Sequence, residues 1–443
     1  MVINLECLIG MRMMIADNSI DAVVTDPPYG LSKQPDMNEV LRHWLNGDDY
    51  VHTGGGFMGK TWDSFVPGPS IWKEVFRVLK PGGHLLAFFG TRTYDLGTLA
   101  IRLAGFEIRD QIDWVYGSGF PKSLDVSKAI DKAAGAERSE VIGKSARHNS
   151  RSFGSEAGDN DYGTYVGGVP DILAPVTDEA KQWQGWGTAL KPAHEPICVA
   201  RKPLTGTVAE NVLQFGTGGM NIDDCRTELN GDFKSSANGR PSITGLSDNY
   251  NPSTANQPDT QGRWPTNFIH DGSDEVVSLF PAKAGAAAPV KGTEQSEVTN
   301  GIYGKFNDRL PGQFYSDSGN AARFFYCAKA SKSDRDEGVM LAMVTAAEMT
   351  DREPDTDGLN SPRAGAGRTS GARNNHPTVK PTALMQWLVR LVTPPGGKVL
   401  DPFTGSGSTG KACAIEGFDF IGFEMDPHYC EIAKQRIAYV NNR

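Results

Sequence analysis

The sequence has few cysteines, and none of them is paired at a metal-binding or redox spacing. The six cysteines among its 443 residues form no Cys-x-x-Cys motif. A disulfide framework and a structural zinc site are therefore not indicated, and the pattern fits a reducing cytoplasm. The chain also lacks an apolar run long enough to cross a bilayer, and its first residues lack the features of a secretory signal. We therefore expect a cytoplasmic protein without a membrane partner.

Acidic residues are missing from one long stretch of an otherwise acidic chain. The net charge of -9 disfavours a nucleic-acid partner, because contacts to phosphates need Lys and Arg. Between Asp357 and Asp401, however, no Asp or Glu occurs, while Lys and Arg occur six times. Taken alone, this stretch describes a solvated loop followed by a helix. It becomes informative only where another feature of the chain calls for DNA.

The two ends of the chain alternate between predicted strands and helices. Periodicity predicts strands at 21–25, 84–90, 106–116, 398–401 and 420–424, and helices at 71–79, 94–104, 381–393, 409–416 and from Pro427 onward. The segment Lys80-Pro81-Gly82-Gly83 is expected to end the first of these helices. This alternation is typical of an α/β fold with a doubly wound parallel sheet.

The middle of the chain reads as irregular. Residues 118–376 contain four stretches rich in Gly, Ser, Asn and Pro, at 143–168, 230–262, 283–320 and 354–376. Loops of this length in a folded protein are usually functional or disordered. Shorter structured islands, such as EPICVARKPL and RWPTNFIHDGSDEVVSLF, separate them, and the region shows no repeat, helix-turn-helix signature or zinc spacing.

The first chemical motif is Asp26-Pro27-Pro28-Tyr29, at the end of the strand predicted at 21–25. Ligands of open α/β sheets bind at such strand ends. The two prolines lack N–H donors, which leaves nearby carbonyls free as acceptors. An exocyclic amine has two N–H bonds, which the Asp26 carboxylate and the Pro27 carbonyl are suited to accept. Tyr29 offers a face on which an extruded base can stack. A plain proline turn is the alternative.

The second motif, VLDPFTGSGSTGKA, joins a strand to a helix through the turn Gly405-Ser406-Gly407. Glycine lets the backbone approach a ligand closely, and Asp401 and Phe403 flank this turn. Glu424 ends the next strand, where a carboxylate usually holds ribose hydroxyls. The spacing from Gly405 to Lys411 also resembles the start of a phosphate-binding loop. Ala412 stands where that loop needs Ser or Thr, so a nucleotide triphosphatase is disfavoured; a plain αβ turn stays open.

The two motifs together resemble the DNA amino-methyltransferases that act on N6 of adenine or N4 of cytosine. The catalytic motif precedes the cofactor motif, and this circularly permuted order is similar to that of the beta class, in phage or bacterial type. The resemblance covers roughly 1–125 and 375–443. It implies a Rossmann-like sheet of seven strands with a large irregular target-recognition insertion, S-adenosylmethionine as cofactor, and Asp26, Pro27, Pro28 and Tyr29 as catalytic residues.

The same resemblance assigns the cofactor site. It implies that Glu6, in the segment NLECL, lies at the cofactor adenine, where the family usually has Asp. The segment His376-Pro377-Thr378-Val379-Lys380-Pro381 resembles one that lines the methionine end. The complete set of cofactor-binding residues that it implies is Glu6, Thr378, Lys380, Asp401, Phe403, Gly405, Ser406, Gly407 and Glu424, with no metal.

The resemblance implies direct methyl transfer to a flipped adenine in double-stranded DNA, as in restriction-modification systems. Cytosine C5 methylation needs a thiol that usually follows proline, and no cysteine here follows one. N4-cytosine methylation, RNA methylation and a non-catalytic nucleic-acid-binding module stay open as alternatives, and so does a homodimer.

The implied division is a catalytic half at 1–125, a target-recognition region at 126–374 and a cofactor-binding half at 375–443. Basic residues of the middle region suit contacts to phosphates. They are Lys122, Lys128, Lys132, Lys144, Arg147, Arg151, Arg363, Arg368 and Arg373.

Overall fold

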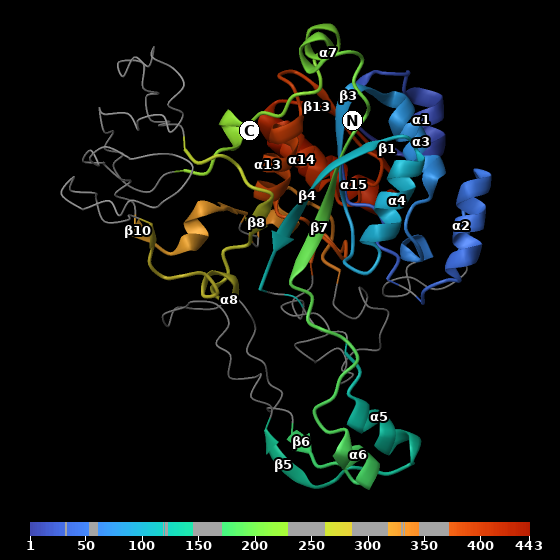
Figure 1. The fold of residues 1–443 in the computed structure, drawn as a ribbon, viewed down its shortest axis with the longest axis vertical. Helices are drawn as coiled ribbons and strands as arrows, with labels where there is room; N and C mark the ends of the chain where they lie inside the picture. The colour runs from blue at the N-terminus through green and yellow to red at the C-terminus, as the bar shows by residue number, and fades with distance from the viewer. Residues whose placement is uncertain are drawn as a thin grey trace, which may run out of the picture.

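The protein is built around one mixed sheet, seen in a computed structural model. The structure describes residues 1–31, 33–52, 61–117, 119, 123–144, 171–228, 262–285, 318–328, 331, 333–344 and 372–443. Across the sheet, the strands of the described ranges run in the order β1 (Val2–Asn4), β13 (Asp419–Glu424), β12 (Lys398–Asp401), β2 (Ile20–Thr25), β3 (Leu79–Phe88), β7 (His194–Arg201), β4 (Glu107–Val115), β8 (Phe268–His270) and β11 (Tyr326–Cys327) (Figure 1). Neighbours pair in parallel except β7, which is antiparallel to both β3 and β4.

Helices cover both faces of this sheet. One face is covered by α1 (Cys7–Met14), α2 (Met37–Asn46), α3 (Pro69–Val78) and α4 (Tyr94–Leu103), and the other by α13 (Thr382–Val392), α14 (Ser408–Glu416) and α15 (Pro427–Asn441) (Figure 1). Successive residues of a strand point to opposite faces. Val23 accordingly packs in the first core, whereas Ala22 and Val24 pack in the second. The predicted α/β doubly wound, Rossmann-like fold is confirmed.

Part of the middle region belongs to this sheet. The sheet has nine strands in the described ranges, two more than the seven predicted, because the short strands β8 and β11 extend it. The island EPICVARKPL supplies most of β7, which lies at the centre of the sheet and leaves Ile197, Cys198 and Ala200 fully buried. The chain from 126 to 374 therefore contributes strands to the core as well as long connections.

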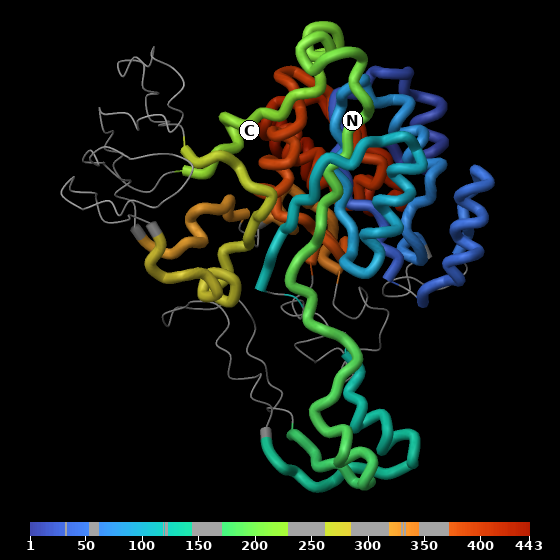
Figure 2. The backbone as a smooth tube through the Cα atoms, in the orientation of Figure 1, coloured from blue at the N-terminus to red at the C-terminus, as the bar shows by residue number. Residues whose placement is uncertain are grey.

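A small unit is inserted between β4 and β7. It consists of α5 (Val126–Ala133), the antiparallel pair β5 (Val141–Lys144) and β6 (Asp171–Leu173), and α6 (Asp178–Gln182). The carboxylate of Asp131 holds it together, accepting hydrogen bonds from Arg138 and from the backbone of Val176 and Thr177. Figure 2 shows the unit standing apart from the sheet.

The other described helices and strands are short and surround the sheet. They are η2 (Thr61–Asp63), α7 (Val208–Phe215), η4 (Asp223–Cys225), α8 (Asp274–Val277), β9 (Ala284–Gly285), β10 (Ser318–Gly319), η6 (Ala321–Phe324) and α9 (Ser333–Asp336). Within the ranges that the structure describes, no helix is long and apolar enough to cross a membrane.

The predicted elements at the two ends of the chain are found within a few residues of their expected bounds. One detail differs. The helix α3 ends at Val78 as predicted, but Lys80-Pro81-Gly82-Gly83 already belongs to strand β3. Leu79 pairs with Ile20, and the pairing resumes at His84 and Ala22 after an irregularity. Gly82, at φ +76°, absorbs this irregularity, so a segment that reads as a turn lies inside a strand.

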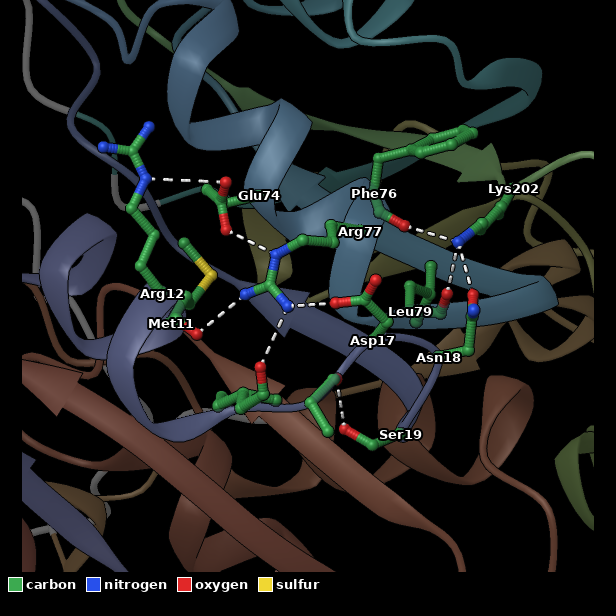
Figure 3. A network of polar contacts seen from close by, with 12 residues as sticks. Met11, Arg12, Asp17, Asn18, Ser19, Glu74, Phe76, Arg77, Leu79 and Lys202 are labelled. Carbon is green, nitrogen blue, oxygen red and sulfur yellow. Dashed lines mark hydrogen bonds and ion pairs between the residues drawn. The ribbon is translucent and has the colours of Figure 1, made fainter.

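Ion pairs and carbonyl contacts fix the edge of the sheet opposite the motifs (Figure 3). Arg77 of α3 donates to Asp17 at 2.6 Å, to Glu74 at 2.7 Å and to the carbonyl of Met11 at 2.8 Å, which ties α3 to α1. Lys202, directly after β7, donates to Asn18 Oδ1 and to the carbonyls of Phe76 and Leu79 at 2.7–2.8 Å. The C-terminal end of α1, the loop before β2 and the end of β7 are thereby held together.

The two halves of the chain meet at the middle of the sheet. Strand β12, from the C-terminal part, pairs in parallel with β2, from the N-terminal part. The chain continues from β12 to β13 on one side and from β2 to β3 on the other. Ligands of doubly wound folds bind in the crevice at such a switch point, at the carboxyl ends of the strands. Asp401 ends β12 there, and Asp26 directly follows β2.

Candidate active site

A cavity of about 1590 Å³ opens at this switch point. Its walls include all four residues predicted as catalytic and all but one of those predicted to bind the cofactor; the exception is Gly407. Segments far apart in the sequence thus form one site, and the predicted groups share it.

The Asp-Pro-Pro-Tyr turn is fixed by contacts from two other elements. Asp63, which is 4 % exposed, accepts hydrogen bonds from the backbone N–H groups of Tyr29 at 2.7 Å and Gly30 at 3.2 Å. Thr93 donates to the carbonyl of Tyr29 at 2.6 Å. Pro27 and Pro28 line the cavity and have no N–H group to satisfy. The turn is therefore preorganised without a ligand.

The two carboxylate oxygens of Asp26 have different surroundings. Oδ2 lies 2.7 Å from Nζ of Lys380, whose side chain is 7 % exposed. Oδ1 is buried and has no hydrogen-bond partner. A buried, unsatisfied acceptor costs about 1–3 kcal/mol, so it marks a position where a ligand donor is favoured. Asp26, which lines the cavity, thus has one acceptor oxygen without a protein partner.

Lys380 joins the predicted catalytic residues in space. Besides Asp26, its ammonium contacts Oε2 of Glu195 at 3.1 Å and donates to the Tyr29 hydroxyl at 3.2 Å. Burial favours the neutral amine, but the charges of Asp26 and Glu195 outweigh it and raise the pKa of Lys380. The residue predicted to hold the methionine end of the cofactor therefore also touches the carboxylate predicted to be catalytic.

Tyr29 is held at its hydroxyl and along its ring. The hydroxyl donates to Glu195 Oε2 at 3.0 Å. Burial, reinforced by Asp26 and Glu195, raises the pKa of Tyr29, so the phenol stays neutral. A Cβ added at Gly90 would lie 3.3 Å from the ring, so glycine there lets the ring pack closely. These contacts fix the orientation of the Tyr29 side chain in the cavity wall.

Asp401 links the second motif to the first. Its Oδ1 accepts from Thr25 Oγ1 at 2.6 Å and from the N–H of Phe403 at 3.1 Å. Burial raises the pKa of Asp401 to about 6, although hydrogen bonds from Thr25, Thr409 and Phe403 oppose the shift. Phe403 lies beside it on the cavity wall.

The glycine turn and Glu424 form the next part of the wall. Gly405, at φ +51°, donates to Glu424 Oε2 at 2.8 Å, and Asp426 donates to Oε1 at 2.8 Å. Burial raises the pKa of Glu424 to about 7. A Cβ at Gly405 would lie 2.8 Å from Nε2 of His376, so the space there depends on glycine. The turn is a backbone cradle beside the buried Asp401 and the half-buried Glu424.

Two residues of the turn, Ser406 and Gly407, pack against helix α15. Gly407, at φ +80°, precedes α14, and a Cβ there would lie 2.8 Å from Ala433 of α15. The absence of a side chain at Gly407 lets α14 pack closely on α15, and Gly407 does not line the cavity. Arg436 of α15, fully buried, donates to the carbonyl of Ser406 at 2.5 Å and to its hydroxyl at 3.1 Å.

Glu6 and Thr378 also line the cavity. Both oxygens of Glu6 accept backbone hydrogen bonds, from Leu8 at 2.9 Å and Ile9 at 2.8 Å, and so cap α1. Its placement at a cofactor adenine stays a prediction, since the carboxylate already has this structural task. Thr378 accepts at its carbonyl from Nδ1 of His376 at 2.7 Å. Burial lowers the pKa of His376 to about 4, so its ring is neutral.

The phosphate-loop alternative finds no support in the position of Lys411. Its side chain is 3 % exposed and pairs with Glu337 at 2.7 Å. It does not line the cavity. The lysine that would have to reach phosphates is buried in a structural ion pair.

Sequence reasoning missed two carboxylates of the site, Glu195 and Asp63. Glu195 directly precedes the apolar run PICVA, and an acidic residue at the start of a sheet strand was the available signal. That signal would have indicated a site residue only if the island EPICVARKPL had been recognised as a central strand of the sheet. Asp63 lies in TWDSF, where nothing in the sequence points to a partner 34 positions earlier.

One buried and one half-buried carboxyl group, an aromatic residue and a glycine cradle suit a ligand that carries positive charge and hydroxyl groups. S-adenosylmethionine, with its sulfonium, ammonium and ribose, has this chemistry. The unsatisfied Oδ1 of Asp26 in the same cavity suits an amine donor. Fold and site together have the features of a Rossmann-like protein that uses this cofactor.

The chain belongs to the DNA methylase family of N6-adenine and N4-cytosine enzymes, whose family model matches residues 20–435. The cofactor of this family is S-adenosylmethionine, as predicted.

Curated relatives align over short segments. The DNA adenine methyltransferase YhdJ of Escherichia coli is 41 % identical over 63 residues, which are 14 % of this chain and 21 % of that protein. The type II methyltransferase M.SmaI of Serratia marcescens is 43 % identical over 63 residues, 14 % of this chain and 22 % of that protein. The chain thus spans about a fifth of the length of these relatives.

Solved structures align over almost the whole chain at low identity. The M1.HpyAVI–SAM complex is 12 % identical with a TM-score of 0.34 and covers 98 % of both chains. The cytosine-N4-specific PvuII DNA methyltransferase is 13 % identical with a TM-score of 0.41, covering 100 % of this chain and 91 % of that one. At these TM-scores the likeness carries no argument about activity.

Proposed function

We propose that the protein transfers the methyl group of S-adenosylmethionine to the exocyclic N6 amine of an adenine in double-stranded DNA. One observation carries the proposal. The buried Oδ1 of Asp26 has no partner, and Asp26 lines the cavity that also holds the acidic cofactor turn. Membership of the DNA methylase family supports the same reaction.

In this proposal Asp401, Phe403, Gly405, Ser406 and Glu424 hold the cofactor, together with Glu6, Thr378 and Lys380. When bound, S-adenosylmethionine supplies an electrophilic methyl group on a sulfonium. The cradle around Gly405 and the carboxylates of Asp401 and Glu424 complement its positive charges and hydroxyl groups. Gly407 acts indirectly, through the packing of α14 on α15.

The catalytic residues bind and orient the amine of the target base. Asp26 Oδ1 accepts one amine N–H, and the carbonyl of Pro27 accepts the other. Both contacts direct the nitrogen lone pair away from the protein acceptors and toward the methyl donor. Tyr29 packs against the extruded base. Holding the two reactants aligned in a dry cavity supplies much of the rate enhancement, without a covalent enzyme intermediate.

DNA recognition is proposed for the parts of 126–374 outside the central sheet, with 1–125 and 375–443 as the catalytic and cofactor halves. The unit with α5 and α6 is inserted at the edge of the sheet that bears Asp26, because Val115 and His194 pair there. Lys128, Lys132 and Arg373 are exposed and suited to phosphate contacts. The other basic residues predicted to contact phosphates lie outside the described residues: Lys122, Arg147, Arg151, Arg363, Arg368 and the side chain of Lys144.

A homodimer and a cytoplasmic location stay predictions.

The test supplies the protein with S-adenosylmethionine labelled in its methyl group and a duplex DNA pool that contains all short sequences. The DNA is then digested and its nucleosides are separated. Label in N6-methyladenine is the expected result. Label only in N4-methylcytosine would replace adenine by cytosine as the substrate, and label in an RNA pool alone would replace DNA by RNA.

The matched control for this assay is Asp26→Ala. This variant should fold and bind the cofactor but label no nucleic acid. The same result for the unmodified protein would contradict the proposal as a whole.

A further inference from the structure

Glu195 lies at the catalytic carboxylate although it comes from the middle of the chain. It is the second residue of β7 and pairs with Trp114 of β4, at the edge of the sheet where β2 ends. Its Oε2 lies 3.0 Å from the Tyr29 hydroxyl and 3.1 Å from Nζ of Lys380. The same ammonium lies 2.7 Å from Asp26 Oδ2. One buried cation is thus shared by two carboxylates.

The charge of this cluster does not balance. Asp26 and Glu195 bring two negative charges and Lys380 one positive charge, and their side chains are 20 %, 20 % and 7 % exposed. Solvent screens such charges weakly, so the excess negative charge is felt inside the cavity. If Lys380 faced Asp26 alone, the pair would be neutral and Asp26 would be a poorer acceptor.

We propose that Glu195 is a positioning residue for the methyl transfer: it shares the Lys380 ammonium with Asp26, so that the charge of the Asp26 carboxylate is only partly compensated and Oδ1 is left for the amine. This inference rests on the proposed function and deepens it. It assigns Lys380 to the catalytic carboxylates, in addition to the cofactor contact expected from the sequence.

The reaction gains from this excess charge. As the N–C bond forms and the C–S bond breaks, the electron pair of that bond stays on sulfur and the amine nitrogen becomes positive. The amine then loses one proton, which Asp26 Oδ1 is placed to accept. A site with net negative charge stabilises the developing positive charge on nitrogen. A neutral site provides less of this stabilisation.

The position of Glu195 is fixed independently of its side chain. Strand β7 pairs with β3 from His84–Arg201 to Phe88–Ile197, and with β4 along its whole length. At its far end, Lys202 donates to Asn18, Phe76 and Leu79 (Figure 3). Replacing the Glu195 carboxylate by an amide should therefore leave the strand in place, so that the variant reports on charge.

The test measures kcat on duplex DNA and the Kd of S-adenosylmethionine for Glu195→Gln, Lys380→Gln and the double variant. In Glu195→Gln, Asp26 faces the ammonium alone, and kcat should fall roughly tenfold or more, the size expected for a charged hydrogen bond. The cofactor Kd should change by less than about threefold, because the cofactor turn follows β12 and Glu424 ends β13, whereas Glu195 lies on β7.

The double variant, Glu195→Gln with Lys380→Gln, distinguishes an effect of charge from a loss of structural support. Removing both charges leaves Asp26 with its own charge uncompensated, so kcat should recover in part relative to Glu195→Gln. If Glu195 only supported the structure, the second substitution would lower kcat further, and that result would overturn the inference.

The control is Glu107→Gln. Glu107 lies on β4 and pairs with Arg201 at 2.8 Å, opposite the other end of β7 and outside the cavity. Its kcat should equal that of the unmodified protein, which is measured first. If the unmodified protein labels no DNA, the proposed function fails; if it does and Glu195→Gln is equally fast, only the present inference fails.

Discussion

Thr25 donates a hydrogen bond of 2.6 Å to Oδ1 of Asp401, across 376 positions of the sequence. The two residues stand at the ends of β2 and β12, which pair in parallel at the switch point of the sheet. Asp26 directly follows Thr25, so this bond ties the proposed catalytic turn to the proposed cofactor turn. Chemistry between a base and a cofactor needs this proximity, and the parallel pairing provides it.

Replacing Asp26 should separate chemistry from cofactor binding. In Asp26→Asn the side chain keeps its size but loses its negative charge, so methyl transfer should fall by about a hundredfold or more. Cofactor affinity should change little, because Asp26 lies on β2 and the cofactor turn follows β12. Kinetics with labelled cofactor and calorimetric titration would check both. A large loss of cofactor affinity would mean that Asp26 belongs to the cofactor site.

Cofactor affinity should fall as the pH is lowered through about 7. Burial raises the pKa of Glu424 to about 7. Below that pH the group is protonated and loses its charge, which a cationic ligand needs. As the pH falls from about 7 to about 5.5, the Kd of S-adenosylmethionine should therefore rise, by no more than roughly tenfold per pH unit.

In Glu424→Gln this part of the pH dependence should vanish, leaving the smaller contribution of Asp401, whose pKa is about 6. A Kd with the same pH dependence in both proteins would contradict the assignment.

The raised pKa of Glu424 also predicts that the stability of the ligand-free protein changes with pH in the opposite direction to the cofactor affinity. A carboxyl whose folded pKa is raised contributes stability that is present below its unfolded pKa and is lost as the pH rises through the folded pKa. The free energy of unfolding of the protein, compared with that of Glu424→Gln, should therefore decrease between about pH 4.5 and pH 7. Urea titrations at several pH values would measure it. An increase over that window would refute the raised pKa.

Gly405→Ala should weaken cofactor binding more than its backbone strain alone explains. The residue has φ +51°, and a Cβ there would lie 2.8 Å from His376 Nε2, at the cavity wall. Gly417→Ala is the matched control, because Gly417 has φ +77° and nothing within 4 Å of an added Cβ. Both should lose about 1 kcal/mol of stability. Only Gly405→Ala should raise the cofactor Kd, and an equal Kd in both variants would argue against a cradle at Gly405.

Arg436 should be a strong determinant of stability although it lies outside the cavity. It is fully buried and donates to the carbonyls of Ser406 at 2.5 Å and Asp334 at 2.6 Å. In Arg436→Gln these carbonyls lose their donor, and the free energy of unfolding should fall by about 2–4 kcal/mol. Arg443→Gln, at a side chain 67 % exposed, should change it by less than about 1 kcal/mol. Equal unfolding midpoints for the two variants would show that Arg436 does not support the turn.

The parts of the site predicted from sequence are those that local patterns encode. Asp26, Asp401 and Glu424 each follow or end an apolar strand, and that position alone brings them to the same edge of a parallel sheet. Gly407 was placed at the cofactor by the same pattern, yet its contact is with Ala433 on the neighbouring helix. Local sequence does not distinguish a glycine that a ligand needs from one that a helix needs.

Glu195 and Asp63 could not be predicted in this way. Glu195 reaches the site because β7 inserts antiparallel between β3 and β4, and such pairing depends on contacts between distant residues. Asp63 acts on the turn at Tyr29 from a short helical segment that carries no motif. Neither position has a periodic or compositional signal that names its partner.

The sequence by itself determined the family, the α/β alternation at both ends of the chain and the two motifs, because strand, turn and helix patterns are encoded within a few neighbouring residues. Only the tertiary structure decided which charges meet. It placed Lys380 between Asp26 and Glu195 and left Oδ1 of Asp26 without a partner. It also engaged both carboxylate oxygens of Glu6 in capping the N-terminus of α1. The energy of a buried charge depends on what surrounds it in space, and those neighbours come from three separate parts of the chain.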